Sequence, residues 1–469
     1  MNCRMLFLAG ALPIAAARAD PIVVDFSREV GPVKMLNGVC NATPLSGSRR
    51  FSLKDLVDKL EIPHYRFHDA SLENPGISLV DVSRVFPLFH ADPDKPENYN
   101  FKPTDDYLKS VVESGAEIEF RLGESIENSR HVYRVNPPQD NEKWADICCH
   151  NIRHYNEGWA DGFRWNVKRW SVWEEPDTNP QLLTGSPCPF KDIYLPLYAT
   201  TALRVKKEFP QLKVGGPQGG GVRNMKLFVD YCAEHCVPID FYGFTTYARH
   251  PEANASLARD IRAYLDSKGF CKTEIVVSEW HWGPVNWAFN GISRKSARHA
   301  KAWNDDLCGP DSTAFTAAML VQMQDAPVDY MYYYSMKCAA WGLFDSSGLP
   351  RGSYYAMMAF ARLAHGKTRV WAPTSPRPGW YLLASKDKAT GRGFVLVSAL
   401  RSDGYLNPLV LNGGVRPVSV KVIDPVYDLE EVKGWKWNAE KNELSVPRFV
   451  GDSTVWLVET VIGGVRDDL

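Results

Sequence analysis

The feature that most constrains the fold is an alternation, starting near residue 33, between short apolar runs rich in β-formers and longer amphipathic runs. This rhythm is typical of βα units, in which helices cover a parallel sheet. Eight runs have strand character. They are Val33–Val39, His64–His68, Glu117–Leu122, Lys168–Trp173, Leu212–Gly216, Ile239–Tyr247, Glu274–Trp280 and Asp329–Ser335. Eight strands with intervening helices predict an α/β fold, a (β/α)8 TIM barrel, over residues 33–364.

The rhythm changes after about residue 365, where short strand-like runs are separated by Gly, Pro, Asn and Asp, and no helical period remains. This pattern predicts an accessory antiparallel β-sandwich over residues 365–469. Its expected strands are Trp380–Ser385, Gly393–Ala399, Pro408–Leu411, Val418–Ile423, Leu444–Val446 and Thr454–Thr460. The β-like run Pro21–Phe26 precedes the barrel, so residues 20–32 are expected to add a strand to the sandwich.

Residues 1–19 have the pattern of a signal peptide, with Arg4 as the charge, Met5–Ala17 as the apolar stretch and Ala17-Arg18-Ala19 as the cleavage site. We therefore expect a secreted or periplasmic protein that begins at Asp20; the alternative is an uncleaved anchor. This is the only long apolar run, and it is too short to span a bilayer comfortably, so no membrane span is expected. Lys and Arg number 54 against 55 Asp and Glu, which leaves no positive field for nucleic acid.

Two glutamates stand at the ends of predicted barrel strands. Glu175 follows the fourth strand, and Glu279 ends the seventh. The carboxyl ends of barrel strands form the catalytic face, and strands four and seven lie on opposite sides of its mouth. Glycoside hydrolysis needs such a pair: one carboxyl protonates the leaving oxygen, and the other attacks the anomeric carbon or activates water. Either glutamate alone is more commonly a solvated loop carboxylate, but the pair, flanked by tryptophans, predicts a glycosidase site.

Several stretches along the barrel match a known family in order and spacing. They are HYRFHD (His64–Asp69), YLKSVVESG (Tyr107–Gly115), WADICCHNIRHY (Trp144–Tyr155), RWSVWEEPD (Arg169–Asp177), LKVGGP (Leu212–Pro217), VPIDFYGFTTY (Val237–Tyr247) and VVSEW (Val276–Trp280). The chain resembles glycoside hydrolase family 39, which contains β-xylosidases and α-L-iduronidases. That resemblance implies a barrel hydrolase with its acid/base after strand four, its nucleophile after strand seven, and a β-sandwich built from both termini.

Carried over to this sequence, the resemblance makes Glu175 the acid/base and Glu279 the nucleophile. It implies that Tyr247 hydrogen-bonds the nucleophile, and that Arg66 and His68 line the sugar subsite. The alternatives are an ion pair at the barrel bottom for Arg66 and a partner of a neighbouring carboxylate for His68.

Four tryptophans near the predicted strand ends are candidates for substrate contact, because flat aromatic rings stack on sugar faces. They are Trp173, Trp280, Trp282 and Trp341. Ordinary core packing is the alternative for these rings.

Two positions depart from the family pattern. The family usually has Asn before the acid/base, where its amide contacts the sugar 2-hydroxyl, and here that position is Glu174. An ionised carboxylate only accepts hydrogen bonds, whereas an amide both donates and accepts. The usual His two residues before the strand-six Tyr is Thr245 here. We count Glu174 among the substrate-binding candidates, and both changes make the identity of the sugar an open question.

The resulting prediction is a secreted, retaining glycoside hydrolase, an exo-acting xylosidase-like enzyme on plant or microbial oligosaccharides or polysaccharides. No P-loop, HExxH or dinucleotide motif occurs, so neither a cofactor nor a metal is expected. Nine cysteines follow the signal peptide at irregular spacing, which suits buried thiols with one or two disulfides at most. The rival hypothesis, favoured by Glu174, is a carbohydrate-binding protein on a catalytically weakened barrel.

Overall fold

The structure is a computed structural model. It describes residues 21–42, 52–68, 79–125, 136–177, 188–219, 222–283, 296–338, 340–364, 368–402, 408–447 and 452–463. The predicted signal peptide at residues 1–19 lies outside the described residues. Within those ranges, no helix combines the length and the apolar character that a membrane crossing needs.

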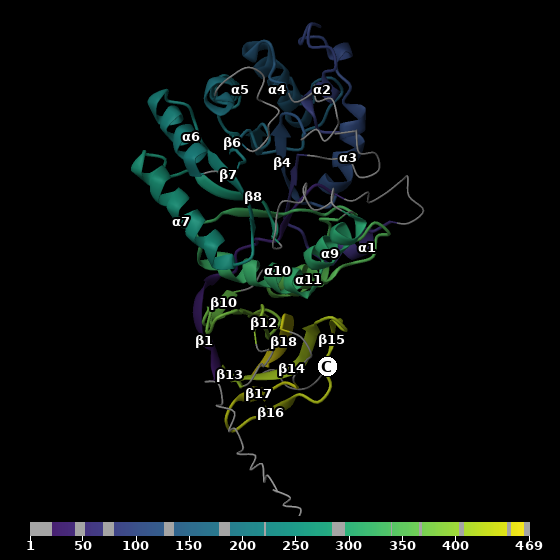
Figure 1. Cartoon of the computed structure of the whole chain (residues 1–469), viewed down its shortest axis with the longest axis vertical. Helices are drawn as coiled ribbons and strands as arrows, with labels where there is room; N and C mark the ends of the chain where they lie inside the picture. The colour runs from purple at the N-terminus through teal and green to yellow at the C-terminus, as the bar shows by residue number, and fades with distance from the viewer. Residues whose placement is uncertain are drawn as a thin grey trace, which may run out of the picture.

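Eight parallel strands close into a barrel in chain order, which confirms the predicted fold class (Figure 1). Every predicted barrel strand has a counterpart. The strands are β2 Gly38–Cys40, β3 His64–Phe67, β4 Glu117–Leu122, β5 Arg169–Val172, β6 Lys213–Pro217, β7 Phe241–Ala248, β8 Glu274–Trp282 and β9 Tyr330–Tyr333. The lumen is filled by side chains, including a buried cluster of Cys40, Phe241, Val276 and Tyr332. A site for a large ligand therefore has to lie at an end of the barrel.

Helices connect the strands and form the outer layer of the barrel. The α-helices are α1 Lys54–Asp58, α2 Val82–Val85, α3 Lys102–Val112, α4 Asn141–Asn156, α5 Leu195–Glu208, α6 Val222–Glu234, α7 Pro251–Ser267, α9 Ala297–Leu307, α10 Pro310–Gln322 and α11 Gly352–Ala364. Short 3-10 turns η1 Pro96–Asn98 and η4 Met323–Asp325 and a π-turn η3 Phe190–Tyr194 complete the set. Asp140 caps α4 by accepting hydrogen bonds from the backbone N–H groups of Glu142 and Lys143.

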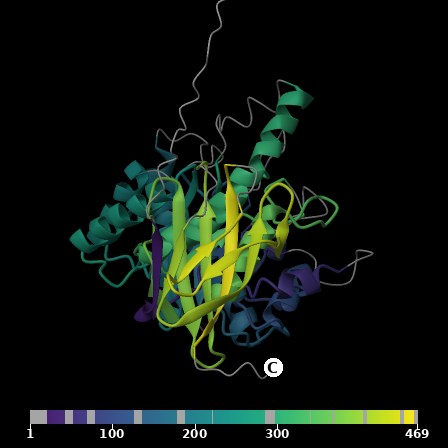
Figure 2. The same ribbon diagram turned by 90° about the horizontal axis from the view of Figure 1, so that it is seen from below.

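A second sheet of ten strands lies beside the barrel, in the order β15-β14-β18-β12-β11-β10-β1-β13-β17-β16. Its strands are β1 Ile22–Pro32, β10 Thr368–Trp371, β11 Trp380–Asp387, β12 Arg392–Ala399, β13 Leu409–Asn412, β14 Val415–Ile423, β15 Asp428–Glu431, β16 Lys436–Asn438, β17 Glu443–Ser445 and β18 Thr454–Ile462. The pairings are antiparallel except for β1 with β13. The curled antiparallel sheet agrees with the predicted accessory sandwich (Figure 2).

The ten-stranded sheet packs against α10 and α11 through one of its faces. Leu383, Leu396 and Leu457 belong to the barrel's hydrophobic core, whereas their strand neighbours Val395 and Val458 belong to the separate core of the second domain. This division follows from the two-residue period of a strand, which sends alternate side chains to opposite faces. One face of the sheet therefore belongs to the hydrophobic core of the barrel domain. It holds the second domain against α10 and α11, the last two helices of the barrel.

The nine cysteines that follow the predicted signal peptide all lie among the described residues. They are Cys40, Cys148, Cys149, Cys188, Cys232, Cys236, Cys271, Cys308 and Cys338. Four of them are buried and five are partly or fully exposed, so the prediction of buried thiols holds for four of the nine, and no disulfide joins two described cysteines. Burial raises the pKa of Cys148 well above its ordinary value, which makes that thiol a small apolar group and a poor nucleophile.

Candidate active site

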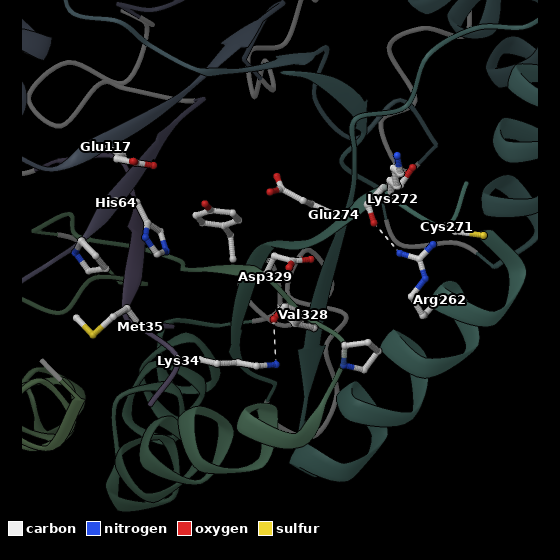
Figure 3. A pocket seen from close by; sticks show the side chains of 14 residues that line it. Lys34, Met35, His64, Glu117, Arg262, Cys271, Lys272, Glu274, Val328 and Asp329 are labelled. Atoms are coloured by element: carbon white, nitrogen blue, oxygen red, sulfur yellow. Dashed lines mark hydrogen bonds between the residues drawn. The ribbon is translucent and has the colours of Figure 1, made fainter. Parts of the chain in front are cut away.

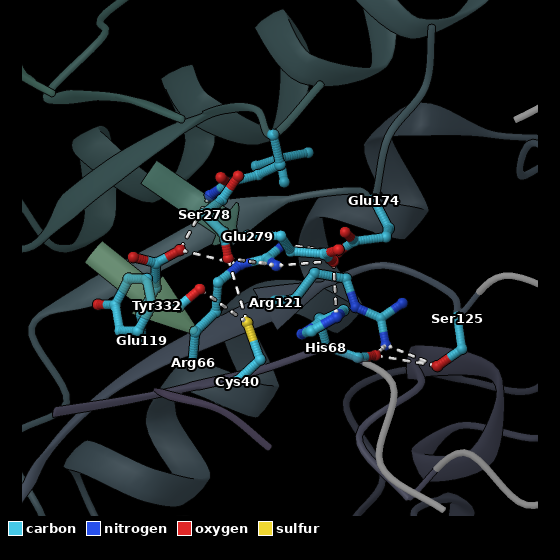
Figure 4. A network of polar contacts seen from close by, with 12 residues as sticks. Cys40, Arg66, His68, Glu119, Arg121, Ser125, Glu174, Ser278, Glu279 and Tyr332 are labelled. Atoms are coloured by element: carbon cyan, nitrogen blue, oxygen red, sulfur yellow. Dashed lines mark hydrogen bonds and ion pairs between the residues drawn. The ribbon is translucent and has the colours of Figure 1, made fainter. Parts of the chain in front are cut away.

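The carboxyl ends of four barrel strands bring most of the predicted site residues together. Arg66 lies on β3, Glu174 and Glu175 follow β5, Tyr247 lies near the end of β7, and Glu279 lies on β8. Figure 4 shows Arg66, His68, Glu174 and Glu279 converging in one network of polar contacts. Residues more than 200 positions apart in the sequence meet here because parallel barrel strands end at the same rim.

Glu279 is held by hydrogen-bond donors on both oxygens. The Tyr247 hydroxyl donates to Oε2. His68 Nε2 lies 2.8 Å from Oε1, and Arg66 Nη1 lies 3.4 Å from the same oxygen. The side chain is only 7% exposed, so these partners replace most of its contact with water. These contacts come from two strands, β3 for Arg66 and the adjoining His68 and β7 for Tyr247, and they fix the orientation of this carboxylate.

Tyr247 is a neutral donor in this arrangement. Burial raises the pKa of Tyr247 well above its ordinary value, and the nearby Glu279, Tyr334 and Glu175 raise it further. The Tyr247 hydroxyl therefore stays protonated at neutral pH and can donate to Glu279.

Arg66 joins three carboxylates at the base of the site. Its Nη2 lies 2.6 Å from Glu174 Oε2, and its Nε lies 3.5 Å from Glu119 Oε1, in addition to the Glu279 contact. Burial lowers the pKa of Arg66, but Glu174, Glu279 and Glu119 outweigh that effect and hold its pKa above its ordinary value. The guanidinium is a permanent positive charge, and it forms ion pairs as in the alternative interpretation, but with carboxylates near the carboxyl ends of the strands and not at the barrel bottom.

Glu174 and Glu175 have different surroundings although they are adjacent. Glu174 is 1% exposed, whereas Glu175 is half-buried. Trp173 and Glu175 have φ angles of 70° and 37°, in the left-handed region that residues with a Cβ rarely adopt. This backbone turns Glu174 down toward Arg66 and leaves Glu175 at the rim. Backbone strain of about 1–3 kcal/mol per such residue is characteristic of functional sites.

Three of the four tryptophans predicted to contact a substrate belong to the core. Trp280 and Trp282 have no exposed surface, and both rings pack on Phe315 of α10. Trp173 is 1% exposed and packs against Trp144. These predictions are wrong, because side chains alternate along a strand: Glu279 faces the lumen, so its neighbour at 280 faces the helices.

Trp341 is the predicted tryptophan that lies beside the network. Its ring is partly exposed, and its centroid lies 5.5 Å from that of Tyr247. Tyr334 lies between them and His68, with ring centroids 6.2 Å from Trp341 and 5.7 Å from His68. These rings form an aromatic wall on the Tyr247 side of the carboxylates, which is the kind of surface on which a sugar stacks.

The deeper part of the network was not predicted from sequence. Glu119 on β4 is fully buried, contacts Arg66, and accepts a hydrogen bond of 2.9 Å from Gln218 Nε2. Arg121, on the same strand, pairs with Asp81 at 2.5 Å. The sequence did contain a signal for Glu119 and Arg121, because charged residues at alternate positions of a buried strand point into the barrel lumen.

Three ligand-type side chains lie close enough to reach one cation: His68, Glu174 and Glu279 have ligand atoms within 4.8 Å of one another. Arg66, however, already contacts both carboxylates, at 2.6 and 3.4 Å. Its guanidinium therefore takes the position between the two carboxylates at which a metal ion would bind them both.

A cavity of about 710 Å³ lies at the opposite end of the barrel (Figure 3). It is lined by the first residues of several strands, including His64, Glu117, Glu274 and Tyr330, and by none of the predicted site residues. Its charges are used in structural pairs, such as Glu117 with Arg169 at 2.8 Å. This end of a barrel serves stability, and we do not place the active site there.

Comparison with family models and curated proteins identifies the family of this chain. The sequence model of glycosyl hydrolases family 39 matches residues 78–391. A β-xylosidase from Geobacillus stearothermophilus is 26% identical over 265 residues, covering 50% of this chain and 51% of that enzyme, so the match spans about half of its length. A β-xylosidase from Caldicellulosiruptor saccharolyticus is 23% identical over 382 residues, covering 73% of this chain and 71% of that enzyme.

The fold is also similar to solved structures. A glucosidase from Croceicoccus marinus aligns with a TM-score of 0.72 at 21% identity, covering 94% of this chain and 98% of that one. At this level of identity the likeness concerns the fold. It extends through both the barrel and the second sheet, because almost the whole of each chain is aligned.

Proposed function

The chain belongs to glycosyl hydrolases family 39, and from that premise we propose that it is a secreted, exo-acting, xylosidase-like retaining glycosidase on plant or microbial oligosaccharides or polysaccharides. The two β-xylosidases similar to it support the choice of sugar class. The observation that carries the proposal is the Glu279 carboxylate, which Tyr247 of β7 and Arg66 and His68 at the end of β3 orient at the rim where Glu175 also lies.

The proposed reaction has two steps. Glu175 protonates the glycosidic oxygen while Glu279 attacks the anomeric carbon, which gives a covalent glycosyl-enzyme. Glu175 then accepts a proton from water, and the water displaces Glu279 with overall retention. The surroundings suit these roles: the half-buried Glu175 can exchange protons with solvent, whereas Glu279 is oriented by Tyr247, His68 and Arg66.

Proton NMR of the first product anomer tests the proposal. A retaining enzyme releases the anomer of the substrate, and its two carboxyls are expected about 5–5.5 Å apart. Release of the opposite anomer would mean an inverting mechanism. Binding of the sugar without turnover of any aryl glycoside would instead support the carbohydrate-binding alternative.

Tyr247→Phe is expected to lower kcat/KM by about 10- to 100-fold, because Glu279 loses a charge-assisted hydrogen bond. The acid limb of the pH profile should also move to higher pH, since the ionised carboxylate has one donor fewer. A pH profile of kcat/KM for both proteins measures the two effects together. A lower rate with an unmoved acid limb would show that Tyr247 contributes only to packing.

Secretion has its own test. The cleavage pattern Ala17-Arg18-Ala19 predicts that exported protein begins at Asp20. N-terminal sequencing of material recovered outside the cytoplasm should read Asp-Pro-Ile-Val-Val. Material that begins at Met1 would show an uncleaved anchor or retention in the cytoplasm.

A further inference from the structure

Glu174 carries a buried oxygen that has nothing to bind in the described part of the chain. Its Oε2 contacts Arg66 Nη2 at 2.6 Å, but its Oε1 has no hydrogen-bond partner among the described residues, and the residue is 1% exposed. Buried polar atoms are almost always paired, because an unpaired one has lost its hydrogen bonds to water without replacement. An ionised carboxylate oxygen can only accept, so the missing partner is a donor.

The position of Glu174 indicates which part of a bound sugar supplies that donor; this step rests on the proposed function. Ligand atoms of Glu174 and Glu279 lie within 4.8 Å of each other. An anomeric carbon bonded to Glu279 therefore places its neighbouring ring atoms beside Glu174. The ring oxygen carries no proton. The substituent on C2 is the nearest group that can donate.

The two sides of Glu279 are distinct. Its Oε1 faces His68 and Arg66, which also contacts Glu174, whereas its Oε2 faces Tyr247. In-line attack sends the leaving group to the face of C1 opposite Glu279, so these two sides correspond to C2 and the ring oxygen. The ring oxygen carries no proton and suits the Tyr247 hydroxyl as a donor, so C2 belongs on the Glu174 side, where a buried oxygen lacks a donor.

The net charge around Glu174 favours a cationic donor on C2 of the sugar over a neutral one. Arg66 contacts three carboxylates, namely Glu119, Glu174 and Glu279. Arg121, also buried nearby, is already paired with Asp81. Burial raises the pKa of Glu174, with Glu279 adding to the effect and Arg66 and His68 opposing it. A hydroxyl would satisfy the hydrogen bond only, whereas an ammonium group would also offset the surplus negative charge.

We propose that the sugar subsite selects glycosides with a protonated amino group on C2, that is 2-amino-2-deoxy glycosides, and that Glu174 is the residue that determines this preference. The N-acetylated forms of these sugars lack the charge and carry a larger group, so the subsite discriminates against them. The preference acts on binding and on the attack at C1 alike, because the C2 substituent stays beside Glu174 in both steps.

The test compares nitrophenyl glycosides that differ only at C2, amino against hydroxyl, in both the xylo and the gluco series. The measured quantity is the ratio of kcat/KM for the amino and the hydroxyl member, in wild type and in Glu174→Gln. An ammonium group on C2 slows cleavage electronically, but this effect cancels when the two proteins are compared. We expect Glu174→Gln, which keeps the shape and removes the charge, to lower the ratio by about tenfold or more.

Glu119→Gln is the matched control. It removes a carboxylate charge from the same guanidinium, but Glu119 lies deeper and contacts Gln218. The amino-to-hydroxyl ratio should therefore stay within about twofold of wild type. A ratio that falls equally in both variants would overturn the direct contact between Glu174 and C2.

Calorimetry on the wild type covers the case in which Glu174→Gln does not fold. The free 2-amino-2-deoxy sugar should bind at least about tenfold more tightly than its 2-hydroxy parent at a pH at which the amine is protonated. Equal affinities for the two sugars, or an unchanged amino-to-hydroxyl ratio of kcat/KM in Glu174→Gln, would overturn the proposed preference for amino sugars. The proposed function would still stand if the wild type hydrolysed the hydroxyl glycosides. Failure of the wild type to hydrolyse any glycoside overturns the proposed function itself.

Discussion

Glu279→Ala is expected to lower kcat on the order of 10⁵-fold with every glycoside, whatever its leaving group. The carboxylate that Tyr247, His68 and Arg66 orient is proposed to form the bond to the anomeric carbon. Without it no glycosyl-enzyme forms, and a better leaving group cannot compensate. Steady-state rates with a nitrophenyl glycoside and with an unactivated disaccharide should fall in parallel.

The control for this loss is Glu113→Ala, at an exposed glutamate that directly follows α3 and whose carboxylate pairs with Lys109 of that helix. It makes the same chemical change far from the rim and should keep wild-type rates. A Glu279→Ala protein that retained more than about one hundredth of wild-type activity would exclude Glu279 as the nucleophile.

Glu175→Ala is expected to show the second largest effect, but one that depends on the leaving group. Loss of a general acid costs about 10²- to 10⁴-fold where the departing oxygen needs a proton, as in a disaccharide. A nitrophenolate leaves with little protonation, so the first step should survive with aryl substrates. The second step then lacks its base, and the glycosyl-enzyme should accumulate as a burst of nitrophenol.

Azide separates the two glutamates. It needs no base to attack, so it should rescue Glu175→Ala and release a glycosyl azide of retained configuration. With Glu279→Ala it should give the inverted azide or no product. The opposite assignment of these azides would mean that the two roles are exchanged.

The barrel was predictable because its strands are buried on both faces and stand out as short apolar runs between amphipathic ones. The predicted family is also confirmed by the match over residues 78–391. Strands β10, β15 and β16 were not predicted. The sequence of β15, Asp-Leu-Glu-Glu, has low strand propensity and becomes a strand only through pairing with β14.

The start of α3 also differs from the local sequence signal. Thr is a common N-cap residue, but α3 begins at Lys102, before Thr104, and the Thr104 hydroxyl donates to the Leu79 carbonyl instead. Pro103 in the first turn suits this earlier start, since proline needs no hydrogen-bond donor there. A side chain that can cap can also bind elsewhere, and a tertiary partner decides between the two.

The site was predictable in its residue identities and not in its geometry. Strand position placed Arg66, Glu174 and Glu279 at one rim. The Arg66 contact with Glu174 and the burial of Trp280 both depend on which side chains face the lumen of the closed barrel. Strict alternation from Glu279 would have predicted the burial of Trp280. The contact between Arg66 and Glu174 depends on the register between strands that are over 100 residues apart.

Trapping of the intermediate tests the central claim most directly. A 5-fluoro glycosyl fluoride of a hydrolysed sugar slows the second step and leaves C2, which faces Glu174, unchanged. Mass spectrometry of proteolytic peptides after this treatment should find one sugar on the peptide that contains Glu279, and none after treatment of Glu279→Ala. A sugar on Glu174 or Glu175, or no covalent adduct together with release of the inverted anomer, would contradict Glu279 as the nucleophile.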